Sequence, residues 1–189
     1  MIMFDLYLKF KDFWPIIKIF LWVFVILLGI ELFKRGFYYL EIWLKKRRTK
    51  KWLEEHKTLE EWEKVDGRKF EEIVAIIFEK LGYKTKIRVD RGIDIIAEKD
   101  GKKTFIQCKR MDKVIPDDVR AFWGSIQRQI EKGKGEGGVF VTTGSFTEGS
   151  KEFVKDKPIE LIDGLELEEL AKEKGVNSIF NKKSNPPSS

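Results

Sequence analysis

Three polar residues, Asp94, Gln107 and Lys109, stand on two short apolar runs joined by Lys99-Asp100-Gly101-Lys102. An Asp-Gly pair between alternating apolar residues is a strong signal for a β-hairpin with a two-residue type I′ turn. Such a turn pairs its two flanking lysines, and counting back along both strands places Asp94 opposite Gln107. Opposed residues share a face of the sheet, with Cβ atoms about 5 Å apart, and Lys109 points the same way because side chains alternate along a strand. A carboxylate, an amide and an ammonium are therefore predicted to converge on one small patch.

The chemistry predicted for this patch is metal-assisted hydrolysis of a phosphodiester. Asp94 lies among isoleucines, where an unpaired carboxylate is costly to bury, so it needs a cation or donors. Mg²⁺ takes oxygen ligands, often one or two carboxylates together with water and substrate phosphate. Asp94 and the side-chain carbonyl of Gln107 are thus candidate ligands for Mg²⁺ or Mn²⁺. Lys109 would pair with the phosphate, stabilise the transition state or help to deprotonate the attacking water.

A fourth candidate is Glu71, on a helix predicted to follow the N-cap Asp66 and to end at Gly82. At 100° per residue, Glu71 falls at the edge of the apolar stripe and can face the sheet. There it would bind the same ion through water or help to bind a second one. The alternative is an ordinary carboxylate at the boundary of an amphipathic helix.

Basic residues precede and follow the predicted patch. They are expected to contact phosphates of a nucleic acid without reading its sequence, and the alternative is ordinary solvated surface. The candidates are Lys86, Arg88, Arg91, Arg110 and Lys113.

Hydrophobic periodicity predicts the elements that position these side chains. Strands are expected at Lys84–Val89, Gly92–Glu98, Lys103–Arg110, Gly137–Thr142 and Ile159–Ile162, and further helices at Asp117–Lys132, Phe146–Val154 and Leu165–Lys174. This order predicts an α/β fold, a mixed sheet covered by helices on both faces.

Residues 1–44 form a predicted membrane-anchor region, with a transmembrane helix at about residues 14–33. Between Trp14 and Phe33 only Lys18 and Glu31 are charged, and about 20 residues of helix cross a bilayer. A signal peptide is the competing interpretation, although no small-residue cleavage site follows the run. A buried core helix is the other alternative, because the fully uncharged run is only 12 residues long.

The distribution of charge gives the remaining organisation. Six basic residues come after the apolar segment and predict, by the positive-inside rule, that the next domain faces the cytoplasm; they are Lys45, Lys46, Arg47, Arg48, Lys50 and Lys51. Residues 45–64 are predicted to form a charged helical stalk, residues 65–175 the folded domain and residues 176–189 a disordered tail. The single cysteine, Cys108, is expected to point into the core and suits a reducing compartment.

Several motifs in order resemble the Mrr-like restriction endonuclease catalytic domain of the PD-(D/E)xK nuclease superfamily. They are Phe70-Glu71, Leu81-Gly82-Tyr83, Asp90-Arg91-Gly92-Ile93-Asp94, Gln107-Cys108-Lys109-Arg110 and Val141-Thr142-Thr143-Gly144. The resemblance implies a restriction-endonuclease-like fold and a metal-dependent endonuclease of double-stranded DNA, a hydrolase similar to type IV restriction enzymes. Asp94, Gln107 and Lys109 match the family's D…QxK core and Glu71 its helical acid, whereas Arg91 replaces the commoner glycine. Members that restrict modified DNA generally carry a winged-helix reader, and this chain has an apolar segment instead.

The leading hypothesis is therefore a membrane-anchored DNA endonuclease at the cytoplasmic membrane. Dimerisation would help such an enzyme to cut both strands. A non-catalytic DNA-binding module tethered to the membrane is the alternative, and a structural adaptor is a third.

Overall fold

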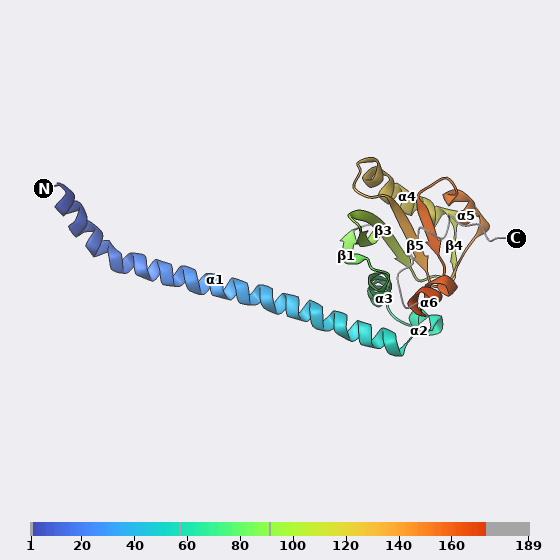
Figure 1. Cartoon of the computed structure of the whole chain (residues 1–189), viewed down its shortest axis with the longest axis horizontal. Helices are drawn as coiled ribbons and strands as arrows, with labels where there is room; N and C mark the ends of the chain where they lie inside the picture. The colour runs from blue at the N-terminus through green and yellow to red at the C-terminus, as the bar shows by residue number, and fades with distance from the viewer. Residues whose placement is uncertain (1, 57, 91, 173–189) are drawn as a thin grey trace. The chain divides into compact units, whose positions relative to one another are not determined.

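A computed structural model describes residues 2–56, 58–90 and 92–172, and the chain divides into two compact units, Met1–Arg47 and Arg48–Ser189. Figure 1 labels the helices and several of the strands. The tail predicted at residues 176–189 lies outside the described residues.

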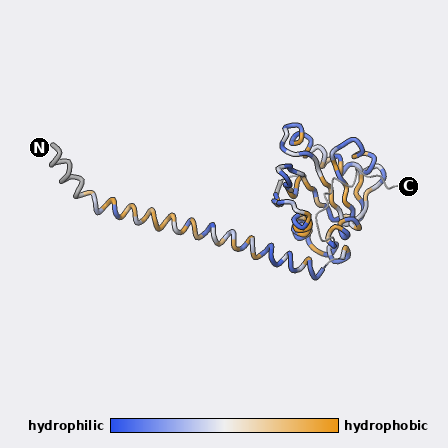
Figure 2. The backbone as a smooth tube through the Cα atoms, in the orientation of Figure 1, coloured by the Kyte–Doolittle hydropathy of each residue, from blue (hydrophilic) through white to orange (hydrophobic). Residues whose placement is uncertain are grey.

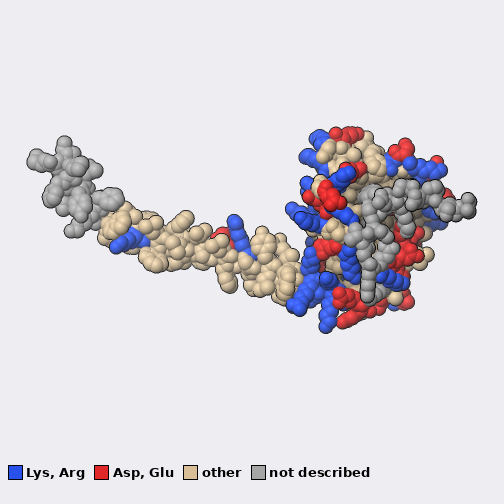
Figure 3. Space-filling view, in the orientation of Figure 1, with Lys and Arg blue, Asp and Glu red and all other residues tan. Residues whose placement is uncertain are grey.

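The first unit consists of most of helix α1 (Ile2–Glu55), which contains the whole apolar segment. From Phe13 onward this helix is long and apolar enough to cross a membrane, and its most apolar stretch is not buried against any other part of the protein. Figure 2 shows the run of hydrophobic residues along the helix, and Figure 3 shows its largely uncharged surface in tan. A core helix would be mostly buried, whereas length and composition alone also fit a signal sequence.

The second unit is built on a five-stranded mixed sheet with the order β1-β2-β3-β5-β7. Strands β1 (Lys84–Asp90), β2 (Ile93–Lys99) and β3 (Lys102–Lys109) are antiparallel neighbours, whereas β5 (Gly137–Thr142) and β7 (Ile159–Ile162) continue the sheet in parallel. A separate two-stranded sheet pairs β4 (Lys113–Val114) with β6 (Ser145–Phe146). The predicted mixed sheet is confirmed. The two-residue strands β4 and β6 were not predicted from the sequence.

Helices cover both faces of the five-stranded sheet, as predicted (Figure 1). Helices α3 (Gly67–Lys80) and α6 (Gly164–Lys172) pack on one face, and α4 (Pro116–Glu131) and α5 (Glu148–Val154) pack on the other. The short helix α2 (Leu59–Glu63) contacts α6. Asp66 caps α3 as predicted, because its Oδ1 accepts a hydrogen bond from the Lys69 amide at 2.8 Å.

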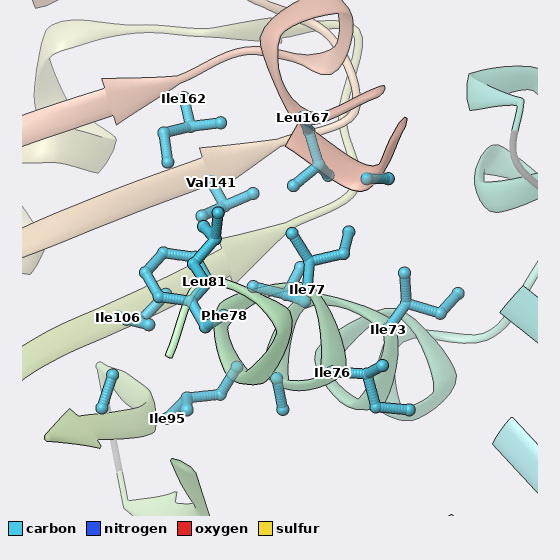
Figure 4. Close-up of a cluster of buried hydrophobic side chains, with 14 of the residues drawn as sticks. Ile73, Ile76, Ile77, Phe78, Leu81, Ile95, Ile106, Val141, Ile162 and Leu167 are labelled. Atoms are coloured by element: carbon cyan, nitrogen blue, oxygen red, sulfur yellow. The ribbon is translucent and has the colours of Figure 1, made fainter. Parts of the chain in front are cut away.

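Two clusters of buried side chains hold the layers together. The first core cluster lies between the sheet and α3 and α6; Figure 4 shows Phe78 of α3 beside Ile106 of the sheet, and Ile73 and Ile77 further along the same helix. The second core cluster lies on the α4 side and is rich in phenylalanine. Side chains alternate between the two faces of the sheet along each strand. Each polar residue on β2 and β3 therefore points either to the α3 side or to the α4 side.

The first core cluster also contains residues from the segment predicted to be a stalk. Leu53 and Trp62 are fully buried in it. The Trp62 indole Nε1 donates to the His56 carbonyl at 3.0 Å, and the buried Thr49 hydroxyl donates to Glu72 at 3.0 Å. The second compact unit therefore includes this segment from Arg48 onward. The segment is dense in charged residues, and its few large apolar side chains pack into the domain.

Candidate active site

The β2–β3 hairpin has the turn and register predicted from its sequence. Asp100 and Gly101 have φ values of 53° and 77°, the conformation that a type I′ turn requires. Pairing runs from Lys99 with Lys102 to Ile95 with Ile106. One step further along, Gln107 Nε2 donates to Asp94 Oδ2 at 2.8 Å, so these two side chains meet on the α4 face of the sheet.

Asp94 is a half-buried carboxylate held by two donors on a single oxygen. Besides Gln107, the main-chain amide of Cys108 donates to Asp94 Oδ2 at 2.7 Å. Burial raises the pKa of Asp94, while the Cys108 amide and the charge of Lys109 act in the opposite direction. Both of these hydrogen bonds are made to Oδ2 and not to the second carboxylate oxygen, Oδ1.

Lys109 lies on the same face but makes its direct ion pair with a residue that sequence reasoning did not single out. Its Nζ donates to Asp118 Oδ1 at 2.6 Å. Asp118 is in the first turn of α4, and its Oδ2 accepts a hydrogen bond from the Ile115 amide at 3.3 Å. In the sequence Asp118 is one of two adjacent acids at the start of a helix, where acidic side chains commonly stabilise the helix through its dipole. Nothing in the sequence therefore distinguished Asp118 from an ordinary residue of a first helical turn.

Glu71 approaches the site from α3 and is also half-buried. Arg68 Nη1 donates to it at 3.3 Å. Burial raises the pKa of Glu71, and the negative charge of Asp94 raises it further, whereas Arg68 acts in the opposite direction. Glu71 therefore lies within electrostatic range of Asp94.

The oxygen donors gathered here suit a hard divalent cation. The described residues contain no group of three or more His, Cys, Asp or Glu side chains able to hold a metal. The candidate donors are two carboxylates, Asp94 and Glu71, and the amide oxygen of Gln107. Mg²⁺ is commonly bound by as few protein ligands as this, and water and phosphate oxygens fill the rest of its coordination sphere. These are the types of oxygen donor that Mg²⁺ and Mn²⁺ prefer.

Gly92 and α4 close one side of the site. Gly92 has φ +83°, and a Cβ placed on it would lie 2.2 Å from Ser125 Oγ and 3.8 Å from Gln107 Oε1. Helix α4 therefore brings Ser125, as well as Asp118, to the hairpin. Only a residue without a side chain fits between Ser125 and the amide of Gln107.

The predicted DNA-contacting residues occupy different surroundings. Lys86 pairs with Ile96 across β1 and β2, which puts it on the face that carries Asp94, and Arg88 lies two residues later beside a bulge. Both are exposed, as is Lys113 on β4. Arg110 donates through Nη1 to the Glu63 carbonyl at 2.9 Å, so it also fastens α2 to the end of β3. Arg91 lies outside the described residues.

Cys108 is on the opposite face of β3, as predicted, and packs partly buried against the first core cluster. Burial raises the pKa of its thiol well above the ordinary value. A neutral thiol is a poor nucleophile and metal ligand. Cys108 therefore contributes its main-chain amide to Asp94, and its side chain contributes to packing.

The fold and the site define a restriction-endonuclease-like nuclease domain. A family model described as a restriction endonuclease, the Mrr catalytic domain, matches residues 62–171, more than half of the chain. The protein belongs to this family, which confirms the resemblance seen in the sequence. The match begins at Trp62, within the segment that enters the first core cluster.

Two solved structures resemble part of the chain. The crystal structure of AF1548, a protein of unknown function, has a TM-score of 0.46 and 23% identity, over 51% of this chain and 61% of that one. The MspJI restriction endonuclease in complex with a 27-mer oligonucleotide has a TM-score of 0.39 and 25% identity, over 52% of this chain and 25% of that one. The chain thus spans less than two thirds of either. A comparison with curated proteins finds no match.

Proposed function

We propose that this protein is a divalent-metal-dependent endonuclease of double-stranded DNA, anchored in the cytoplasmic membrane by α1 with its nuclease domain in the cytoplasm. The observation that carries the catalytic part is the convergence of Asp94, Gln107 and Lys109 on one face of a hairpin, within electrostatic range of Glu71. Membership of the restriction endonuclease family supports DNA as the substrate.

Each polar group has a chemical role in this proposal. Asp94, the Gln107 amide oxygen and Glu71 would hold Mg²⁺ or Mn²⁺, which when bound polarises the phosphoryl oxygen and lowers the pKa of a coordinated water. Lys109 places an ammonium beside Asp94, where it neutralises charge on the scissile phosphate. The Cys108 amide and the Gln107 side chain keep the Asp94 carboxylate in one orientation.

DNA would lie along the α4 face of the sheet near its β1 edge. Lys86 shares that face with Asp94, Arg88 is exposed at the adjacent bulge, and Arg91 is the neighbouring basic residue in the sequence. Contacts from such residues to phosphates position the duplex without specifying its sequence. Lys113 and Arg110 are further candidates for phosphate contacts, and a second copy of the chain would allow both strands to be cut.

The membrane part of the proposal rests on the length, composition and exposure of the apolar portion of α1. The six basic residues after this segment favour a cytoplasmic location for the nuclease domain, by the positive-inside rule. Trp43 also contacts the Arg47 guanidinium, 5.3 Å from the ring centroid. Such aromatic and basic pairs are typical of the interface between a bilayer and water.

Cleavage of supercoiled plasmid by the purified full-length chain, kept in detergent, tests the catalytic proposal. We expect nicking that requires Mg²⁺ or Mn²⁺ and is stopped by a chelator. Asp94→Ala and Lys109→Ala should each lower the rate about 100-fold or more. Lys103→Ala, an exposed lysine on the same strand, is the matched control and should cut normally. Equal cutting by the wild type and both site variants would disprove the assignment.

One observation favours a second candidate, a DNA-binding module without catalysis. The Gln107 amide group and the Lys109 ammonium are both engaged by carboxylates of the protein itself, on Asp94 and Asp118. A purely binding protein would retain DNA with Asp94→Ala, lose it as salt rises and yield no cleaved product under any metal. A gel-shift titration run beside the cleavage assay separates the two candidates.

A further inference from the structure

Lys109 and Asp118 form an ion pair between strand β3 and helix α4. Lys109 ends β3, and Asp118 lies in the first turn of α4. Their Nζ to Oδ1 distance is 2.6 Å, and the side chain of Asp118 is only 18% exposed, against 42% for that of Lys109. The carboxylate is thus the sheltered partner, and the ammonium is the partner that a substrate can reach.

Asp118 is held in place by a hydrogen bond to the main chain and by the packing of its helix. Its second oxygen, Oδ2, accepts from the Ile115 amide at 3.3 Å. One residue later Val119 is fully buried, and Phe122 lies one turn further on, both in the second core cluster. The carboxylate is therefore tied to a helix that the core fixes, whereas Lys109 reaches it through a flexible four-carbon stem.

We infer that Asp118 is a positioning residue for Lys109, holding the ammonium beside Asp94 so that its remaining N–H groups face the scissile phosphate. A lysine ammonium has three N–H donors, so one bond to Asp118 leaves two for phosphate oxygens. Without Asp118 the ammonium would sample several rotamers before each encounter with substrate. This inference rests on the proposed nuclease function and adds a residue that the D…QxK pattern does not contain.

The first turn of α4 provides its own control. Asp117, the preceding residue, pairs with Arg120 on the same helix, and its side chain is 78% exposed. Asp117→Asn removes the same charge from the same turn as Asp118→Asn, without touching Lys109. An effect that came only from the helix dipole or from net charge near DNA would appear in both variants.

The test measures kcat and KM for plasmid nicking by the full-length chain. We expect Asp118→Asn to lower kcat about 10- to 100-fold with KM for DNA nearly unchanged, because misplacement of a reacting group costs about that much. Asp118→Glu, which keeps the carboxylate, should recover part of the loss, and Asp117→Asn should match the wild type. In a Lys109→Met background, Asp118→Asn should have no further effect.

Each outcome decides between the two proposals. If Lys109→Met is inactive while Asp118→Asn has a wild-type kcat, the positioning role is wrong and the nuclease assignment stands. The role is also wrong if Asp118→Asn impairs cleavage equally with and without Lys109, or if Asp118→Asn melts far below Asp117→Asn, since a structural role explains both results. A wild type that cuts no DNA removes the proposed function and the positioning role together.

Discussion

Asp94 is more costly to ionise in the folded protein than in the unfolded chain, because burial raises its pKa. For a carboxyl shifted in this direction, the cost is absent below the unfolded pKa and complete above the folded pKa. Asp94→Asn should therefore raise the melting temperature by a few degrees at neutral pH and have little effect near pH 4. Thermal melts across this range, without metal, check it. A variant that is less stable than the wild type at neutral pH would contradict the expectation.

The raised pKa values of Asp94 and Glu71 also predict how metal binding responds to pH. Both carboxyls retain protons at higher pH than ordinary carboxyls do, and binding a cation requires their ionised forms. Affinity for Mn²⁺ should therefore decline on acidification before ordinary carboxyls are protonated. Calorimetric titration of the free protein at several pH values measures this decline. Glu71→Gln removes one of the two groups and should make the decline shallower; an unchanged profile would exclude Glu71 from the site.

The sequence predicted the residues of this site that lie on the hairpin, and it missed those that reach the hairpin from α4. The difference arises because local geometry relates only the first group. Asp94, Gln107 and Lys109 are related by one hairpin, whose turn residues set the register. Glu71 was identified by helical periodicity. Asp118 and Ser125 reach the hairpin only through the packing of α4 on the sheet, and neither periodicity nor a motif specifies which residues of a helix will meet a given strand. Arg110, predicted on charge alone, also holds a main-chain carbonyl.

At the level of elements, the hairpin and α4 approach each other closely at Gly92. Gly92→Ala should lower both stability and cleavage, because the new Cβ would overlap Ser125 and the residue has φ +83°. Gly101→Ala is the matched control. It also has a positive φ, +77°, but open space around it, so it should cost only about 1–2 kcal/mol of backbone strain and leave cleavage intact. Melting curves and plasmid nicking by both variants measure the difference. Equal losses of stability and cleavage in the two variants would mean that the overlap between a Cβ at position 92 and Ser125 is unimportant.

Most elements were predictable because each has an internal signal. The β5 and β7 strands have the predicted bounds, since both are apolar runs bordered by turn residues. The two-residue strands β4 and β6 are too short to have any periodicity, and they form because tertiary packing brings their main chains together. The segment before α3 was assigned to a stalk because its burial depends on contacts with α3 and the sheet, which no local pattern displays.

The early start of the domain makes a prediction about truncation. A protein comprising residues 48–189 keeps Leu53 and Trp62, whereas one comprising residues 65–189 loses both from the first core cluster. The loss of a fully buried large side chain costs about 3–5 kcal/mol, comparable to the whole stability of many domains. We expect a cooperative thermal transition for residues 48–189 and none for residues 65–189. Folded behaviour of the shorter protein, judged by circular dichroism and melting, would show that the N-terminal segment is dispensable.

For the whole molecule, the exposed apolar stretch of α1 predicts where the protein resides. The full-length chain should sediment with membranes and stay there through a high-salt wash, because hydrophobic insertion is insensitive to screening. Residues 48–189 should be released by the same wash. A protease added outside intact cells should leave the nuclease domain uncut if it faces the cytoplasm. Release of the full-length chain by salt alone would show that the basic residues, and not α1, mediate binding.

Leu53 and Trp62 follow the apolar segment in the sequence and lie inside the core of the nuclease domain. Their position limits where proteolysis could release the domain from the apolar segment without damaging its core. Many anchored proteins are shed by cutting an exposed connector, which frees an intact catalytic fragment. Here a cut that discarded everything before Trp62 would also discard Leu53 and the buried Thr49 hydroxyl that binds Glu72. A cut between Thr49 and Trp62 should therefore destabilise the domain, whereas a cut before Arg48 should leave its core intact.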